Sequence, residues 1–208
     1  MKKTLLKVLY GIFAVVLLQV NSKAQIQILQ EFKNYHSRSI GTYQNIHYRE
    51  AGFSSLYPIA GSQGTEFWTC SDRGVNIDAA NANEVACRPT YDKIFPFPSY
   101  SPKIHRLRLR GDSIQIIQTI PVRRPNGQGA TGLINPTGLG STALEMPSVD
   151  TVNSCSSFMQ KLTQKDTFGI DCEGLVVDPD GNFWLCEEGG PTIWKLNKAG
   201  VLIQRFTP

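Results

Sequence analysis

The most regular alternation of apolar and polar residues lies near the end of the chain, in residues 171–206. An apolar run at 174–177 meets Asp178-Pro179-Asp180-Gly181, whose proline and glycine suit a tight turn between two strands. Residues 192–196 and 201–206 form two further strand-like runs on either side of a second turn-like spacer. The pattern therefore predicts four short antiparallel strands.

Pairing the first two of these strands brings acidic residues together. With the turn at the centre of the hairpin, Asp171 falls opposite Glu188 and Cys172 falls opposite Glu187, while Glu173 lies beside them. Four carboxylates then share one end of the strand pair. Directly opposed like charges destabilise a strand pair by roughly 0.2–1 kcal/mol, so the arrangement is better explained if a cation lies among them.

An internal repeat of this unit lies earlier in the chain. Residues 67–74 align with residues 183–190 and are identical at Phe, Trp, Cys and the final Gly, which places Asp72 where the later copy has Glu188. Four runs are the predicted strands of this copy: 55–59, 67–71, 103–109 and 114–120. In 103–109 apolar residues alternate with basic ones, which indicates an outer strand with one solvent-exposed face.

Four antiparallel strands in about 36 residues are the size of one β-propeller blade, so the fold is predicted to be all-β with propeller-type blades. The blades lie near 53–120 and 171–206, separated by an insertion at 121–170 whose glycine-rich part, 127–132, is expected to be a surface loop. Propellers typically have 4–8 blades. Residues 25–208 are therefore interpreted as the N-terminal part of a larger, incomplete propeller.

The first 24 residues have the features of a secretory signal peptide, namely a basic start, an apolar core at 8–20 and a small-x-small site at Ser22-Lys23-Ala24. The alternative is an uncleaved membrane anchor, although the apolar core is short for a membrane-spanning helix. Cleavage would remove four lysines and leave 17 basic and 17 acidic residues. This balance argues against nucleic-acid binding, and we expect a secreted or periplasmic protein without membrane attachment.

Five cysteines in an exported chain suggest disulfides with one thiol left over. Cys70 with Cys87 and Cys155 with Cys172 are the local options, and the sequence does not decide the pairing. The alternative is that Cys70 and Cys186, each two residues after a tryptophan, are small buried residues. The histidines are isolated and have no zinc-finger spacing, which argues against a zinc site.

Several stretches resemble the phytase-like family, which is named for an esterase-like activity of phytase. They are 71–74, 94–98 with 101–103, and above all 171–175 through 180–184 to 187–191, in the family's order. The likeness covers roughly residues 52–208. It implies a propeller, export and metal-assisted hydrolysis of phosphate or other esters. Gly189 departs from the family, which usually has an aromatic residue there.

The resemblance and the acidic cluster together suggest a hydrolase that uses a divalent cation such as calcium and acts on a small-molecule ester or phosphoester. Carboxylates are the hard oxygen ligands that calcium prefers. The expected metal ligands are Asp72, Asp171, Glu173 and Glu188, and the expected catalytic residues are Arg73, which would clamp substrate oxygens, and Glu187. One alternative is that Arg73 makes a structural ion pair with Glu187 or Glu188.

Two other functions are compatible with the same residues. The chain could belong to a non-catalytic propeller that binds a ligand or a protein partner, or it could be a truncated, inactive fragment. More acidic residues at the matching ends of further blades would favour a metal site, whereas aromatic or neutral residues there would favour binding.

Overall fold

The computed structural model describes residues 28–43, 45–78, 93–139 and 165–207. The chain divides into two units, Met1–Glu31 and Phe32–Pro208, and the fold described below is that of the second unit. The predicted signal peptide lies outside the described residues. Among the residues that are described, no helix has the length and apolar character needed to cross a membrane.

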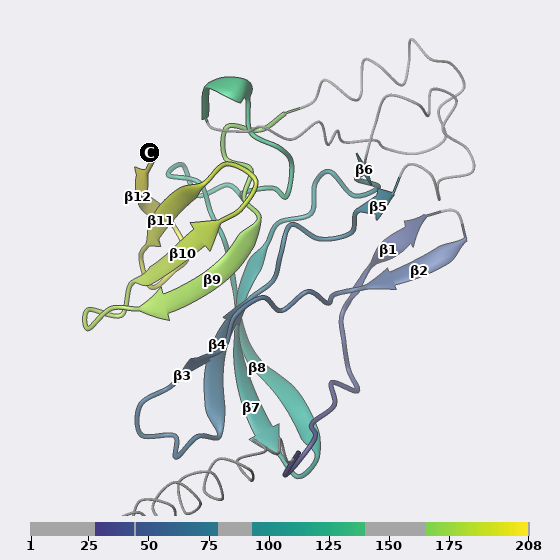
Figure 1. Cartoon of the computed structure of the whole chain (residues 1–208), viewed down its shortest axis with the longest axis vertical. Coiled ribbons are helices and arrows are strands. Elements are labelled where there is room, and N and C mark those ends of the chain that lie inside the picture. Colours follow the sequence, from purple (N-terminus) through teal and green to yellow (C-terminus); the bar gives the residue numbers. More distant parts are fainter. Residues whose placement is uncertain (1–27, 44, 79–92, 140–164, 208) are drawn as a thin grey trace, which may run out of the picture. The chain divides into compact units, whose positions relative to one another are not determined.

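Two four-stranded antiparallel sheets form the framework, which confirms the all-β prediction (Figure 1). The first sheet has the order β3-β4-β7-β8 and the second the order β12-β11-β10-β9, so each matches one copy of the repeat. The strands of the first sheet are β3 (Tyr57–Pro58), β4 (Glu66–Cys70), β7 (Lys103–Arg110) and β8 (Ser113–Pro121). Those of the second are β9 (Cys172–Val177), β10 (Phe183–Glu187), β11 (Thr192–Leu196) and β12 (Leu202–Phe206).

The β9–β10 hairpin owes its turn to Asp178 and Gly181. The Asp178 carboxylate accepts a hydrogen bond from the Asn182 backbone N–H at 2.8 Å, and Gly181 takes a positive φ of 81° that a glycine adopts without strain. A β-bulge between Cys186 and Glu187 then shifts the register by one residue. Glu187 therefore pairs with Cys172 as predicted, although the pairs nearer the turn are displaced by one.

Two hairpins were not predicted from the sequence: β1 (Ser39–Tyr43) with β2 (Ile46–Arg49), and β5 (Ile77–Asp78) with β6 (Lys93–Ile94). The first turns at Asn45, which has a positive φ of 62°, a conformation that asparagine tolerates better than most residues. The inner strand predicted at 55–59 is shorter than expected, because only Tyr57 and Pro58 pair with β4.

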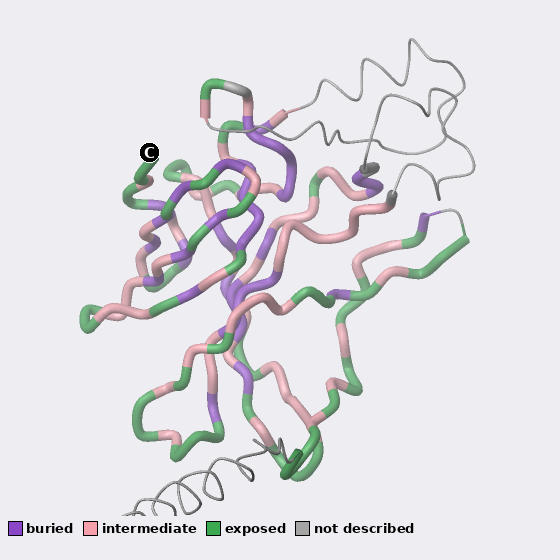
Figure 2. The backbone as a smooth tube through the Cα atoms, in the orientation of Figure 1, coloured by how far each residue is buried: buried purple, intermediate pink, exposed green. Residues whose placement is uncertain are grey.

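The main hydrophobic core is built from both sheets. Figure 2 shows buried stretches along β4 and β7 and through the second sheet. Ile104 and Cys70 contribute from the first sheet, and Leu185 and Trp194 from the second, all with 0% exposure. Trp68 of β4 packs edge-on against Phe183 of β10, with ring centroids 5.1 Å apart. The core therefore joins the two copies of the repeat through aromatic and aliphatic contacts.

The described part of the predicted insertion also belongs to this core. Val122, Ala130 and Ile170 are buried in it, and residues 132–135 are buried as well. The expectation that 127–132 forms a surface loop is therefore wrong for its second half. A Cβ atom at Gly132 would collide with the backbone carbonyl of Arg73, so glycine permits this loop to approach the segment after β4 closely. The short 3₁₀ turn η3 (Thr137–Leu139) follows.

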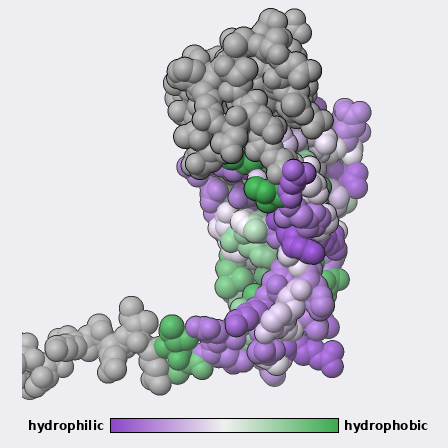
Figure 3. Space-filling view, turned by 90° about the vertical axis from the view of Figure 1, so that its right-hand side faces the viewer, coloured by the Kyte–Doolittle hydropathy of each residue, from purple (hydrophilic) through white to green (hydrophobic). Residues whose placement is uncertain are grey.

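On the face shown in Figure 3, hydrophilic residues predominate and hydrophobic ones appear in separate patches.

Candidate functional site

Three acidic residues meet at the end of the β9–β10 hairpin. Asp171, Glu173 and Glu188 each offer a carboxylate oxygen, and these oxygens all lie within 4.8 Å of one another. Asp171 and Glu188 are neighbours because the Glu188 backbone N–H donates to the Asp171 carbonyl oxygen at 3.1 Å. Asp171 is buried, whereas Glu173 and Glu188 are exposed. The structure thus brings together three of the four predicted metal ligands.

Arg73 reaches this cluster from the first sheet. Its guanidinium Nε lies 3.1 Å from Asp171 Oδ2, and its backbone N–H donates to Asp171 Oδ1 at 3.1 Å. The guanidinium carbon also lies 5.3 Å from the centre of the Phe95 ring. Arg73 therefore forms an ion pair with Asp171, and the pair ties the segment after β4 to the start of β9.

Asp72, the fourth predicted ligand, lies next to the three-carboxylate group but outside it. Its Oδ1 accepts a hydrogen bond from the Gly74 backbone N–H at 2.8 Å, and its own backbone N–H donates to the Gly52 carbonyl at 2.9 Å. Burial raises the pKa of the Asp72 carboxyl, and the charge of Asp171 adds to that rise. Asp72 therefore shares the electrostatic environment of the cluster.

Glu187 points to the backbone of the loop that follows β10. Its Oε2 accepts a hydrogen bond from the Gly190 backbone N–H at 2.7 Å, and its Oε1 accepts one from the Asp171 backbone N–H at 3.3 Å. Burial raises the pKa of this carboxyl although the backbone hydrogen bonds oppose the rise. The side chain holds Asp171 and the loop in place.

Glu173 lies among several other negative charges, which affect its own ionisation. Partial desolvation by the surrounding chain raises the pKa of its carboxyl, and repulsion by Asp171, Glu188 and Asp72 raises it further. A positive charge within the cluster would reverse the repulsive part of this effect. The arrangement is thus able to take up either a proton or a cation.

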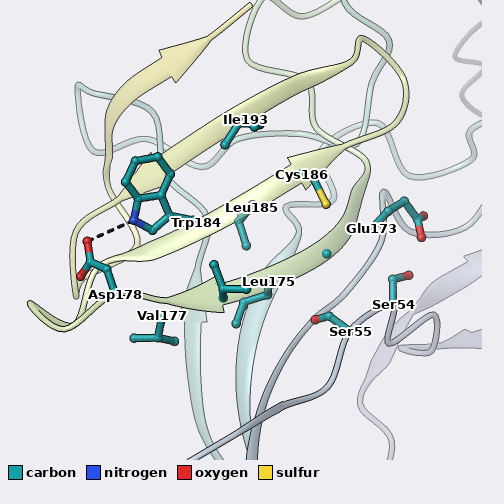
Figure 4. Close-up of a pocket in the computed structure, with 12 residues that line it drawn as sticks. Ser54, Ser55, Glu173, Leu175, Val177, Asp178, Trp184, Leu185, Cys186 and Ile193 are labelled. Atoms are coloured by element: carbon teal, nitrogen blue, oxygen red, sulfur yellow. Dashed lines mark hydrogen bonds between the residues drawn. The ribbon is translucent and has the colours of Figure 1, made fainter.

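A groove of about 690 Å³ runs from Glu173 along the second sheet (Figure 4). Glu173 and Ser54 lie at one end, and Trp184 and Asp178 at the other, where the indole N–H donates to the Asp178 carboxylate at 3.1 Å. Between them the walls are mainly apolar, with Leu175 on β9 among the labelled side chains. The acidic cluster therefore borders an apolar surface.

The family model described as "Phytase-like: Esterase-like activity of phytase" matches residues 49–208. The chain belongs to the phytase-like family. All six predicted site residues, and both sheets, fall within the matched segment.

One curated relative is an uncharacterized secreted protein of Arthroderma benhamiae. It is 38% identical over 39 residues, which is 19% of this chain and 8% of the relative. The chain thus matches only a small part of that protein's length. No solved structure matches the chain significantly.

A buried polar network lies beside the predicted site of this phytase-like chain and was not predicted from the sequence. Glu50, only 3% exposed, accepts hydrogen bonds from Lys103 Nζ at 2.8 Å and from the Tyr100 hydroxyl at 3.2 Å. The Tyr100 hydroxyl also lies 3.0 Å from Ser71 Oγ, next in the chain to Asp72. His105 Nε2 lies 3.4 Å from the second Glu50 oxygen.

Lys103 and His105 of this network lie on strand β7, for which the alternation of apolar and basic residues predicted a solvent-exposed basic face. That prediction is wrong for His105, which has 0% exposure and whose Nδ1 lies 3.0 Å from Thr119 Oγ1. Burial on its own raises the pKa of Glu50, but His105 and Lys103 outweigh it and lower the value to about 2. The only signal in the sequence was that Lys103 and His105, two residues apart in β7, fall on the same face of the strand.

Proposed function

We propose that the two sheets of this phytase-like chain are consecutive blades of a β-propeller. The support comes from comparing equivalent residues of the repeat. Trp68 of the first sheet packs on Phe183 of the second, and Trp184 occupies the corresponding position of the second sheet. On the face that carries Trp184, Val176 is 53% exposed and Ile193 is 47% exposed. A third sheet with an aromatic residue in the place of Phe183 would cover this face in the same way.

For the chemistry, we propose metal-assisted hydrolysis of a phosphoester or carboxylester. The observation that carries the proposal is the mutual spacing of the Asp171, Glu173 and Glu188 carboxylates. Oxygens that bind one calcium ion at 2.3–2.6 Å lie no more than about 5 Å apart, so three oxygens within 4.8 Å suit a single ion of this kind. Family membership supports the same reaction class.

The donor set fits a hard divalent cation, because all three groups are carboxylates and two of them are open to solvent. When bound, such an ion polarises a phosphoryl or carbonyl oxygen and lowers the pKa of a coordinated water. The acidic residues of this chain would hold the ion, with Asp72 adding negative charge from one side. Arg73 would fix the orientation of Asp171 through its two contacts with that carboxylate.

The side chains expected to act on the substrate are partly engaged in the fold. Arg73 is paired with Asp171, and Glu187 accepts backbone hydrogen bonds through both oxygens. These contacts favour positioning roles for Arg73 and Glu187. They are also the observation that supports the second candidate, a non-catalytic propeller whose acidic cluster binds a calcium ion or a basic ligand.

We also propose that the protein is exported and acts outside the cytoplasm. The basic, apolar and small-residue segments of the first 24 residues support this proposal, and the curated relative that matches part of the chain is named as secreted.

The test of catalysis uses p-nitrophenyl phosphate and p-nitrophenyl acetate as substrates, with calcium added or removed by a chelator. We expect calcium-dependent release of p-nitrophenol that Glu173→Gln and Glu188→Gln each reduce at least tenfold. Asp180→Asn is the matched control, since Asp180 is an exposed acid in the β9–β10 turn. Calcium binding without hydrolysis would favour the non-catalytic candidate, and hydrolysis unaffected by chelation would contradict the proposed reaction.

A further inference from the structure

Two fully buried cysteines from different sheets meet in the core. Cys70 is the last residue of β4 and Cys172 the first residue of β9, and each has 0% exposure. Strand β9 packs against β4. The Cys70 thiol lies 3.8 Å from the Cys172 carbonyl oxygen, and both residues are present as free thiols in the structure. Residues 102 positions apart in the chain thus share one site.

The two thiols also interact with each other. Their side chains are hydrogen-bond partners in the core. Ser55 Oγ also lies 3.3 Å from Cys70 Sγ. The two sulfurs are therefore held beside each other, each buried within the packed sheets.

We propose that Cys70 and Cys172 form a disulfide that links the two sheets when the chain folds under oxidising conditions. The oxidant is a small or protein disulfide, such as oxidised glutathione. The thiolate of one cysteine attacks the oxidant and releases one reduced thiol. The other cysteine, as thiolate, attacks the mixed disulfide and releases the second thiol. The two cysteines lose two electrons and two protons in total, and the oxidant gains them.

Burial determines when this bond forms and how it behaves. A reagent cannot reach either sulfur once the sheets have packed, so oxidation occurs while they are docking, and the finished bond resists reductants until the protein unfolds. The bond closes a loop of roughly 100 residues, the class of loop for which a cross-link restricts the unfolded chain most. Neither the bond nor its effect depends on the proposed hydrolase activity.

Cys186 provides an internal comparison. It occupies the same position in the second sheet as Cys70 does in the first, but it is exposed and lines the groove. A thiol reagent added to the native protein should modify Cys186 rapidly. Cys70 and Cys172 should remain unmodified under these conditions, whether they are reduced or oxidised.

The test refolds the full chain in a buffer of reduced and oxidised glutathione, blocks remaining thiols and digests the protein without reduction. Trypsin combined with a protease that cuts after glutamate is suitable, because cleavage after Glu173 separates Cys172 from Cys186. We expect a cross-linked peptide pair that contains Cys70 and Cys172 and disappears on reduction. Pairing of Cys70 with Cys87, pairing of Cys155 with Cys172, or recovery of both cysteines as blocked thiols would overturn the proposal.

A stability measurement gives an independent readout. Reduction in denaturant followed by refolding under reducing conditions should lower the urea midpoint of the wild-type chain. The double variant Cys70→Ala/Cys172→Ala should show no such shift. An equal midpoint for the oxidised and reduced wild-type chains would contradict the proposed bond, and this comparison does not require the variant to fold.

Discussion

Replacement of Glu50 by glutamine should remove one of the larger pH-dependent contributions to the stability of this fold. The Glu50 carboxylate is buried between Lys103 and His105, and glutamine keeps its shape while removing its charge. Lys103 Nζ would then lose the carboxylate that lies 2.8 Å away. Removal of one partner from a buried ion pair strongly destabilises the folded protein, because the other charge stays desolvated.

The magnitude follows from the pKa. The value for Glu50 falls from 4.5 to about 2 on folding, and at 1.36 kcal/mol per pKa unit this difference corresponds to about 3 kcal/mol. Because the folded-state pKa is the lower one, the stabilisation is fully present above pH 4.5. It is lost as the pH falls from 4.5 towards 2, where the folded protein also binds the proton.

Urea unfolding of the wild-type chain and Glu50→Gln at a series of pH values measures this effect. We expect the variant to be less stable by about 3 kcal/mol at pH 7 and the difference to vanish near pH 2. Glu31→Gln is the control, because Glu31 is exposed. Stability curves of wild type and variant that run parallel from pH 7 to pH 2 would refute the reasoning.

Three further predictions follow from the packing and charges of the site. Trp68→Ala should lower the free energy of unfolding by about 2–4 kcal/mol in urea titrations, because Trp68 packs on Phe183. Trp184→Ala should lower it by less, and equal losses of stability would contradict the difference assigned to the Trp68 and Trp184 faces of the two sheets. Gly132→Ala should lower the free energy of unfolding by about 1–3 kcal/mol, because the added Cβ would collide with the Arg73 backbone. At Gly138 an added Cβ meets open space, so equal melting temperatures for Gly132→Ala and Gly138→Ala would contradict this contact. Calcium affinity measured by calorimetry should fall as the pH is lowered below neutral, because the raised pKa of Glu173 lets protons compete for the cluster. A pH-independent affinity would show that Glu173 is not a ligand.

The strands could be predicted because this chain repeats its own pattern. The alternation in β7 and β8, the turn at residues 178–181 and the matching Phe-Trp-x-Cys segments located both sheets. The same local signals placed Asp171 beside Glu188. Register and turn chemistry are short-range properties, so they are visible in the sequence.

The remaining features depend on contacts between residues far apart in the chain. Glu50 meets Lys103 and His105 only after β2 and β7 have been brought together, and no spacing in the sequence indicates this. The contact of Cys70 with Cys172 has the same origin, since sequence proximity favoured Cys87 and Cys155 as partners. The latter two residues lie outside the described part of the chain.

The bulge shows why local prediction also has a limit within one hairpin. A single additional residue at Cys186/Glu187 displaces the pairs next to the turn by one position. It leaves the acidic end in the predicted register. The proximity of Asp171 and Glu188 was therefore predicted correctly, although most pairs of the same hairpin differ from the prediction.

The proposed metal site is tested most directly by calcium calorimetry and urea unfolding of Glu173→Gln beside the wild-type chain. Because the folded-state pKa of Glu173 is raised, its charge costs stability at neutral pH when no cation is present, and glutamine removes that cost. The prediction is that Glu173→Gln is more stable than the wild-type chain without calcium and binds calcium at least tenfold more weakly. A variant that binds calcium as tightly as the wild-type chain, or a wild-type chain that binds none, would contradict the metal site.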